Sequence, residues 1–113
     1  MTVTTLSAAL GSNKMHALHI ALHNGFQGDH VVIEIGGRIV FDRTGVTTDL
    51  RISRADAVDV EVEAEQVTIT VTVLPGVSGS TDLNAAQSPY LAVDLQPDGT
   101  LRWIPSQEPF RYL

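Results

Sequence analysis

Two adjacent stretches, VDVEVEA over residues 58–64 and VTITVTV over residues 67–73, decide the fold. In each stretch every second residue is apolar, and the residues between them are acidic in the first stretch and threonine in the second. Strict alternation is typical of a β-strand with one face in the core and the other in water. Because only Glu65 and Gln66 separate the stretches, the sequence predicts that they pair as an antiparallel hairpin.

Further strands are predicted on both sides of these stretches. Residues 30–35 and 38–41 flank Gly36-Gly37, a dipeptide that supplies the positive φ values of a two-residue hairpin turn. Residues 90–96 and 100–104 flank Pro97-Asp98-Gly99, whose residue types favour a turn. A weaker alternation over residues 46–53 predicts one more strand.

Three regions carry less pattern. Residues 14–24 alternate as a strand, but they also fit a helix capped by Ser12 or Asn13, and we favour the strand because its neighbours are strands. Residues 75–89 are rich in Gly, Ser, Asn and Ala and are predicted to form a long loop. Residues 1–13 are expected to be a flexible tail, which leaves residues 14–113 as a single domain.

Taken together, the pattern predicts an all-β fold with about seven to eight strands. A chain of 113 residues buries roughly two-thirds of its surface on folding, so it can form a core without disulfides or metal. Closely spaced strands without crossover helices indicate an antiparallel β-sandwich or a small barrel. The order of hairpins is similar, in architecture alone, to immunoglobulin-like, transthyretin-like and carbohydrate-binding sandwiches, and fold does not determine function.

Composition excludes several classes of partner. The chain carries 7 basic and 13 acidic side chains, for a net charge of −6, so it lacks the basic clusters that bind nucleic acid or anionic membranes. No apolar run approaches the ~20 residues needed to cross a bilayer. The absence of cysteine excludes disulfides and thiolate metal sites. With no signal-peptide pattern at residues 1–14, we expect a cytoplasmic location.

The densest charge in the chain is the acidic series Asp59, Glu61 and Glu63. Alternation places these three carboxylates on one sheet face, about 6.6 Å apart along the strand, which is too wide for one calcium ion. Such a series is usually a solvated face that discourages edge-to-edge aggregation. The second interpretation is a docking face for a basic partner.

Aromatic residues concentrate near the carboxyl end, which holds Trp103, Phe110 and Tyr112. The first interpretation is that this end packs on the core. If it is exposed instead, these three residues are the best candidate anchors for an oligomer, and Trp103, Tyr90 and Tyr112 are the rings that could stack on a sugar.

Histidine offers only weak candidates for a metal site. His19 and His23 would be neighbours on a helix, but on the favoured strand they lie about 13 Å apart. His30 could approach His23 across the turn at residues 24–28. We therefore interpret the histidines as surface residues and predict neither a metal site nor a cofactor.

The leading hypothesis is a small non-catalytic module that binds another protein, or a second copy of itself to form a homo-oligomer. It rests on the acidic face, the aromatic carboxyl end and the lack of a recognisable catalytic motif. The alternative is a module that binds carbohydrate or another small ligand. A small enzyme or metal-binding protein that uses His23 and His30 is a third hypothesis.

Overall fold

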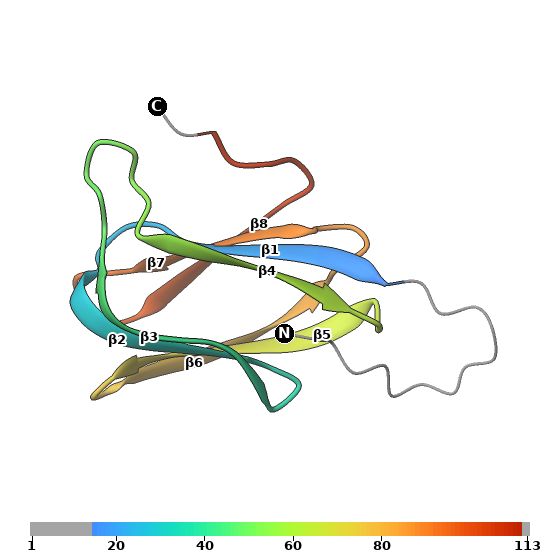
Figure 1. The fold of residues 1–113 in the computed structure, drawn as a ribbon, viewed down its shortest axis with the longest axis horizontal. Coiled ribbons are helices and arrows are strands. Elements are labelled where there is room, and N and C mark those ends of the chain that lie inside the picture. Colours follow the sequence, from blue (N-terminus) through green and yellow to red (C-terminus); the bar gives the residue numbers. More distant parts are fainter. Residues whose placement is uncertain (1–14, 112–113) are drawn as a thin grey trace.

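A computed structural model describes residues 15–111, which form eight β-strands in two facing sheets (Figure 1). The first sheet has the order β4-β1-β7-β8, and the second has the order β3-β2-β5-β6. The strands span β1 His16–Leu22, β2 Gln27–Ile35, β3 Arg38–Thr47, β4 Asp56–Val62, β5 Gln66–Leu74, β6 Val77–Asn84, β7 Tyr90–Leu95 and β8 Leu101–Ser106. All neighbouring strands are antiparallel except β1 and β7, which are parallel. The predicted β-sandwich is confirmed, and the two sheets do not close into a barrel.

The core lies between the sheets and is built from the alternating apolar residues. Each inner strand directs β-branched or leucine side chains inward, and those with at most 1% exposure include Leu18, Ile20, Leu22, Ile33, Ile69, Val71, Leu91 and Val93. The strand interpretation of residues 14–24 is therefore confirmed over His16–Leu22, because Leu18, Ile20 and Leu22 all point into this core.

Two of the predicted hairpins are confirmed. β2 and β3 join through Gly36 and Gly37, with φ values of 57° and 81°. β7 and β8 join through the turn at residues 97–99, where Asp98 accepts a hydrogen bond from the backbone of Thr100.

The predicted hairpin between residues 58–64 and 67–73 is wrong, although both stretches are strands. β4 pairs with β1 in the first sheet, whereas β5 pairs with β2 and β6 in the second. Residues 63–65 therefore carry the chain from one sheet to the other. Alternation shows which face of a strand is buried, but it does not show which strand is its hydrogen-bonded neighbour. The apolar faces of β4 and β5 meet the same core from opposite sheets.

The predicted long loop at residues 75–89 is also wrong, because Val77–Asn84 forms β6. This strand pairs with β5 in continuous register from Val73↔Val77 to Gln66↔Asn84. On the outer face its hydroxyls bond across to the threonines of β5, as in the 2.7 Å pair between Thr70 Oγ1 and Ser80 Oγ. The inward positions of β6 are Val77, Gly79, Thr81 and Leu83, so only the first and last of them carry an apolar signal.

The predicted strand at residues 46–53 is likewise wrong. Val46 and Thr47 end β3, and the chain then forms a turn closed by an isolated bridge between Asp49 and Arg54. Arg51 donates hydrogen bonds to Asp49 at 2.8 and 3.1 Å, and these bonds lower the pKa of Asp49 to about 2. The predicted tail at residues 1–13 lies outside the described residues.

Candidate functional site

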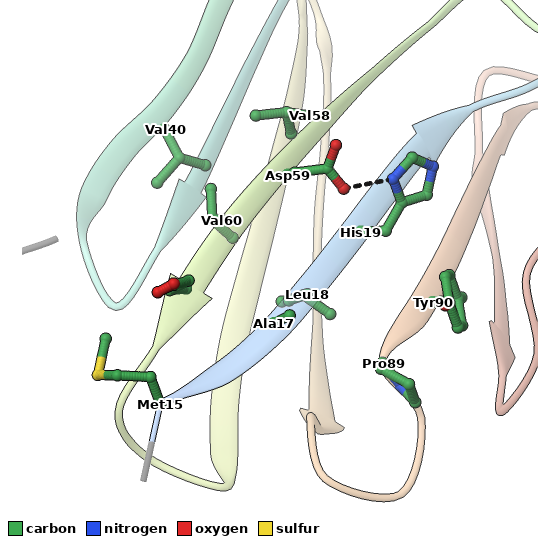
Figure 2. Close-up of a pocket in the computed structure, with 11 residues that line it drawn as sticks. Met15, Ala17, Leu18, His19, Val40, Val58, Asp59, Val60, Pro89 and Tyr90 are labelled. Carbon is green, nitrogen blue, oxygen red and sulfur yellow. Dashed lines mark hydrogen bonds and ion pairs between the residues drawn. The ribbon is translucent and has the colours of Figure 1, made fainter. Parts of the chain in front are cut away.

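A cleft of about 750 Å³ opens beside β4 (Figure 2). We call it the edge cleft. It lies where β4 and β3, the outermost strands of their sheets, face each other without being hydrogen-bonded neighbours. Its lining consists of Met15, Ala17, Leu18, His19, Val40, Val58, Asp59, Val60, Glu61, Pro89 and Tyr90. The lining includes residues from both faces of β4 and also residues of β1 and of the start of β7, so the cleft extends from the outer edge of β4 over the neighbouring part of the first sheet.

One side of the edge cleft is apolar. Figure 2 shows Val58 and Val60 of β4 directed toward Val40 of β3, with Met15 near the start of β1. Val40 reaches the cleft because the register between β2 and β3 shifts between Ile33 and Glu34. Such an irregularity gives one strand an extra residue and redirects its side chain.

The other side of the edge cleft is polar. His19 and Asp59 are direct partners in the β1–β4 register, and His19 Nδ1 lies 2.6 Å from Asp59 Oδ1 (Figure 2). The Asp59 side chain is 81% exposed, so solvent weakens this contact. Glu61 is the next outward residue of β4 and is also exposed. The cleft therefore carries a carboxylate on each of two successive outward positions.

The acidic series predicted from the sequence is split by the structure. Asp59 and Glu61 lie on the outer face of β4 and line the cleft, as alternation predicts. Glu63 lies beyond Val62, the last residue of the strand, and is half-buried. The cleft thus contains two of the three predicted acidic residues.

The predicted aromatic residues do not form one exposed group. Trp103 of β8 is half-buried and packs against the core, close to Gly79 of β6. Phe110 instead contacts Tyr90, with ring centres 6.5 Å apart, and Tyr90 also lines the edge cleft. Tyr112 lies outside the described residues.

The histidines have separate partners. His30 Nε2 lies 2.6 Å from Asp42 Oδ1 on the second sheet, whereas His19 pairs with Asp59 on the first. His23 packs against Phe110, with ring centres 5.0 Å apart. Burial lowers the pKa of His23, an effect that Asp94 opposes and that Arg54 and His19 reinforce. Among residues 15–111, no group of three or more histidine, aspartate or glutamate side chains is arranged to hold a metal ion.

Sequence reasoning missed the apolar half of the cleft, namely Met15, Val40, Val58 and Val60. Their apolar character was visible in the sequence. Their position beside an open cleft depends on which strands become outermost, and alternation carries no signal for strand order.

Comparison with known proteins identifies no relative of this chain. No protein-family model, characterised protein or solved structure matches the chain. Within the described part of the chain, no helix has the length and apolar character needed to cross a membrane.

Proposed function

We propose that the protein is a non-catalytic binding module that takes up an extended segment of a partner protein along β4. The observation that carries this proposal is the edge cleft, whose lining includes residues from both faces of β4, an outermost strand. A strand in that position presents unpaired backbone groups, and an extended peptide can add to them as a further strand.

The two sides of the cleft define the chemistry of the partner. Side chains of an added strand alternate between its two faces. One set would contact Val40, Val58 and Val60, and the other set would lie beside Asp59 and Glu61. The segment that fits this arrangement alternates apolar with basic residues, and the net charge of −6 favours the approach of a basic partner.

We favour a protein over a carbohydrate as the ligand. Sugar rings stack on aromatic rings that face solvent. Trp103 packs against the core, and Tyr90 is engaged by Phe110 and His19, with the His19 ring centre 6.0 Å away. The valines of the edge cleft suit apolar side chains instead.

The test uses a fluorescein-labelled octapeptide of alternating valine and lysine, followed by fluorescence anisotropy. We expect it to bind more tightly than an octapeptide of alternating valine and glutamate, and more tightly than a peptide with four valines followed by four lysines. Equal binding of all three peptides, or no binding at millimolar protein, would overturn the proposal.

Matched charge reversals locate the site. Glu61→Lys should weaken binding of the valine–lysine peptide about fivefold, since one exposed charge pair is worth about 1 kcal/mol. Asp82→Lys places the same charge on β6, at the outermost strand of the other sheet, and should leave the affinity nearly unchanged. An equal loss in both variants would indicate attraction to the net charge alone.

Self-association is the form of this proposal in which the partner is a second copy of the chain. Sedimentation equilibrium at two protein concentrations measures it directly. A mass that rises with concentration, and that falls back to one chain in the Glu61→Lys variant, is the result expected for self-association through the cleft.

A further inference from the structure

The chain after β8 turns back over the outer face of the first sheet (Figure 1). We call residues 107–111 the strap. The turn is fixed by Ser106, whose Oγ donates to the carbonyl of Glu108 at 2.8 Å and accepts from its amide at 3.1 Å. This local pairing sets the direction in which the strap leaves β8.

The strap lies over the outer face of the first sheet where β1 and β7 are neighbours, a position that we call the groove. Ala21 and Ala92 are partners in the parallel register and lie on the outer face, opposite to their inward neighbours Leu22 and Val93. Both alanines are nevertheless 0% exposed. Alternation would place outer-face residues in water, and the full burial of these two small side chains is consistent with the larger side chains beside them and with Phe110 of the strap, which contacts His23 and Tyr90 on this face.

Phe110 is the residue of the strap that contacts the rings beside Ala21 and Ala92. Its ring meets His23 edge-on at 5.0 Å between centres and Tyr90 edge-on at 6.5 Å. His23 follows β1 and Tyr90 begins β7, so these two rings stand on either side of the alanine pair. The groove therefore has small residues at its base and a ring at each end, which suits one aromatic side chain.

We propose that this groove is a binding site for an aromatic side chain, that the chain occupies it with its own Phe110, and that protonation of His23 releases the strap. The charged groups around His23 are His19 on β1, Asp94 on β7 and Arg54 ahead of β4. Asp94 is the one that would stabilise an imidazolium, and its Oδ1 already accepts bonds from the Asn24 amide and side chain at 3.0 and 3.3 Å.

The sign of the pH dependence follows from the burial of His23. Burial is the largest cause of its lowered pKa, so the closed strap favours the neutral imidazole. The closed state is then fully stable above the ordinary histidine pKa of about 6.5, and its stability falls as the pH drops below that value. Release would uncover Tyr90, which also lines the edge cleft. The inference does not depend on the proposed function, because its tests report on the strap itself.

The first test is a proton NMR titration of the histidine ring signals in the full chain. Phe110→Ala should raise the pKa of His23, increasing its proton affinity about threefold or more. Ile39→Ala, on the exposed side of β3, is the control and should leave it unchanged. An unchanged or lower pKa for His23 in Phe110→Ala would overturn the proposal, because Phe110 would then not oppose protonation.

The second test follows backbone motion of the strap by ¹⁵N relaxation at pH 7.5 and pH 5. In the wild-type chain, residues 107–111 should become mobile on the nanosecond timescale at pH 5. His23→Gln should keep the strap ordered at both pH values, whereas His30→Gln, on the second sheet, should behave as the wild type does. A strap that stays ordered at pH 5, or that loosens equally in His23→Gln, would contradict release by His23.

Discussion

Single residues in the turns determine how closely neighbouring segments approach. Gly25, between β1 and β2, has a φ of 93°, and a Cβ atom built on it would lie 1.8 Å from the carbonyl oxygen of Leu95. The backbone of Asn24 accepts a hydrogen bond from the Leu95 amide at 2.9 Å, which holds the turn against the end of β7. At this position glycine is required both by backbone conformation and by the lack of space.

Gly25→Ala should therefore destabilise the fold by more than about 3 kcal/mol, because strained backbone and steric overlap add. Gly28→Ala is the matched control: its φ is 72°, but nothing lies within 4 Å of the added Cβ. We expect Gly28→Ala to destabilise the fold by about 1–2 kcal/mol, because alanine would have to adopt the left-handed conformation there. Urea unfolding measures the free energy of unfolding of both variants. An equal loss of stability in the two would mean that the close approach to Leu95 does not contribute.

At the scale of elements, the sequence predicted which residues form strands better than how the strands pair. The apolar alternation of β1, β4 and β5 placed their buried faces correctly. The pairing of β4 with β1 was missed because a short link suits a hairpin and a sheet-to-sheet connection equally well. β6 was missed because its inward positions include Gly79 and Thr81, which carry little apolar signal.

One side chain joins several elements at the end of the sandwich. Thr48 follows β3 and is 8% exposed. Its Oγ1 donates to the carbonyl of His23 at 2.7 Å and accepts from the amide of Phe26 at 3.1 Å. This hydroxyl thereby ties the turn between β1 and β2 to the end of β3.

Thr48→Val removes both hydrogen bonds while keeping the shape of the side chain. We expect a loss of about 1–3 kcal/mol in the free energy of unfolding, since a buried donor and a buried acceptor lose their partner. Thr48→Ser keeps the hydroxyl, and its free energy of unfolding should fall by about 1 kcal/mol or less. Thermal melting distinguishes the two, and a Thr48→Val variant as stable as the wild type would show that the hydroxyl is dispensable.

At the scale of the whole molecule, the two sheets meet at two lateral margins that differ in packing. At one margin β6 lies against β8, where a Cβ on Gly79 would be 3.2 Å from Leu101 and 3.4 Å from Trp103. At the other margin β3 and β4 leave the edge cleft. The sequence predicted that Asp59 and Glu61 share the outer face of their strand, but the cleft is a product of strand order and could not be predicted from alternation.

Gly79→Val tests the closed margin. The added methyl groups should push against Trp103 and destabilise the fold by about 1–3 kcal/mol, with a change in tryptophan fluorescence. Ser78→Val, next to it on the outward face of β6, should cost less and leave the fluorescence unchanged. A Gly79→Val variant as stable as the wild type, with unaltered fluorescence, would contradict the tight packing of Gly79 against Leu101 and Trp103.

The central claim is that β4 is the strand to which a partner segment adds, and amide hydrogen exchange tests it most directly. The full chain is exchanged with and without the valine–lysine octapeptide, and protection is resolved residue by residue. We expect new protection at amides of Asp56–Val62, with β6 and β8 unchanged. Protection that appears at β6 or β8 instead, or bound peptide without new protection in β4, would contradict the account.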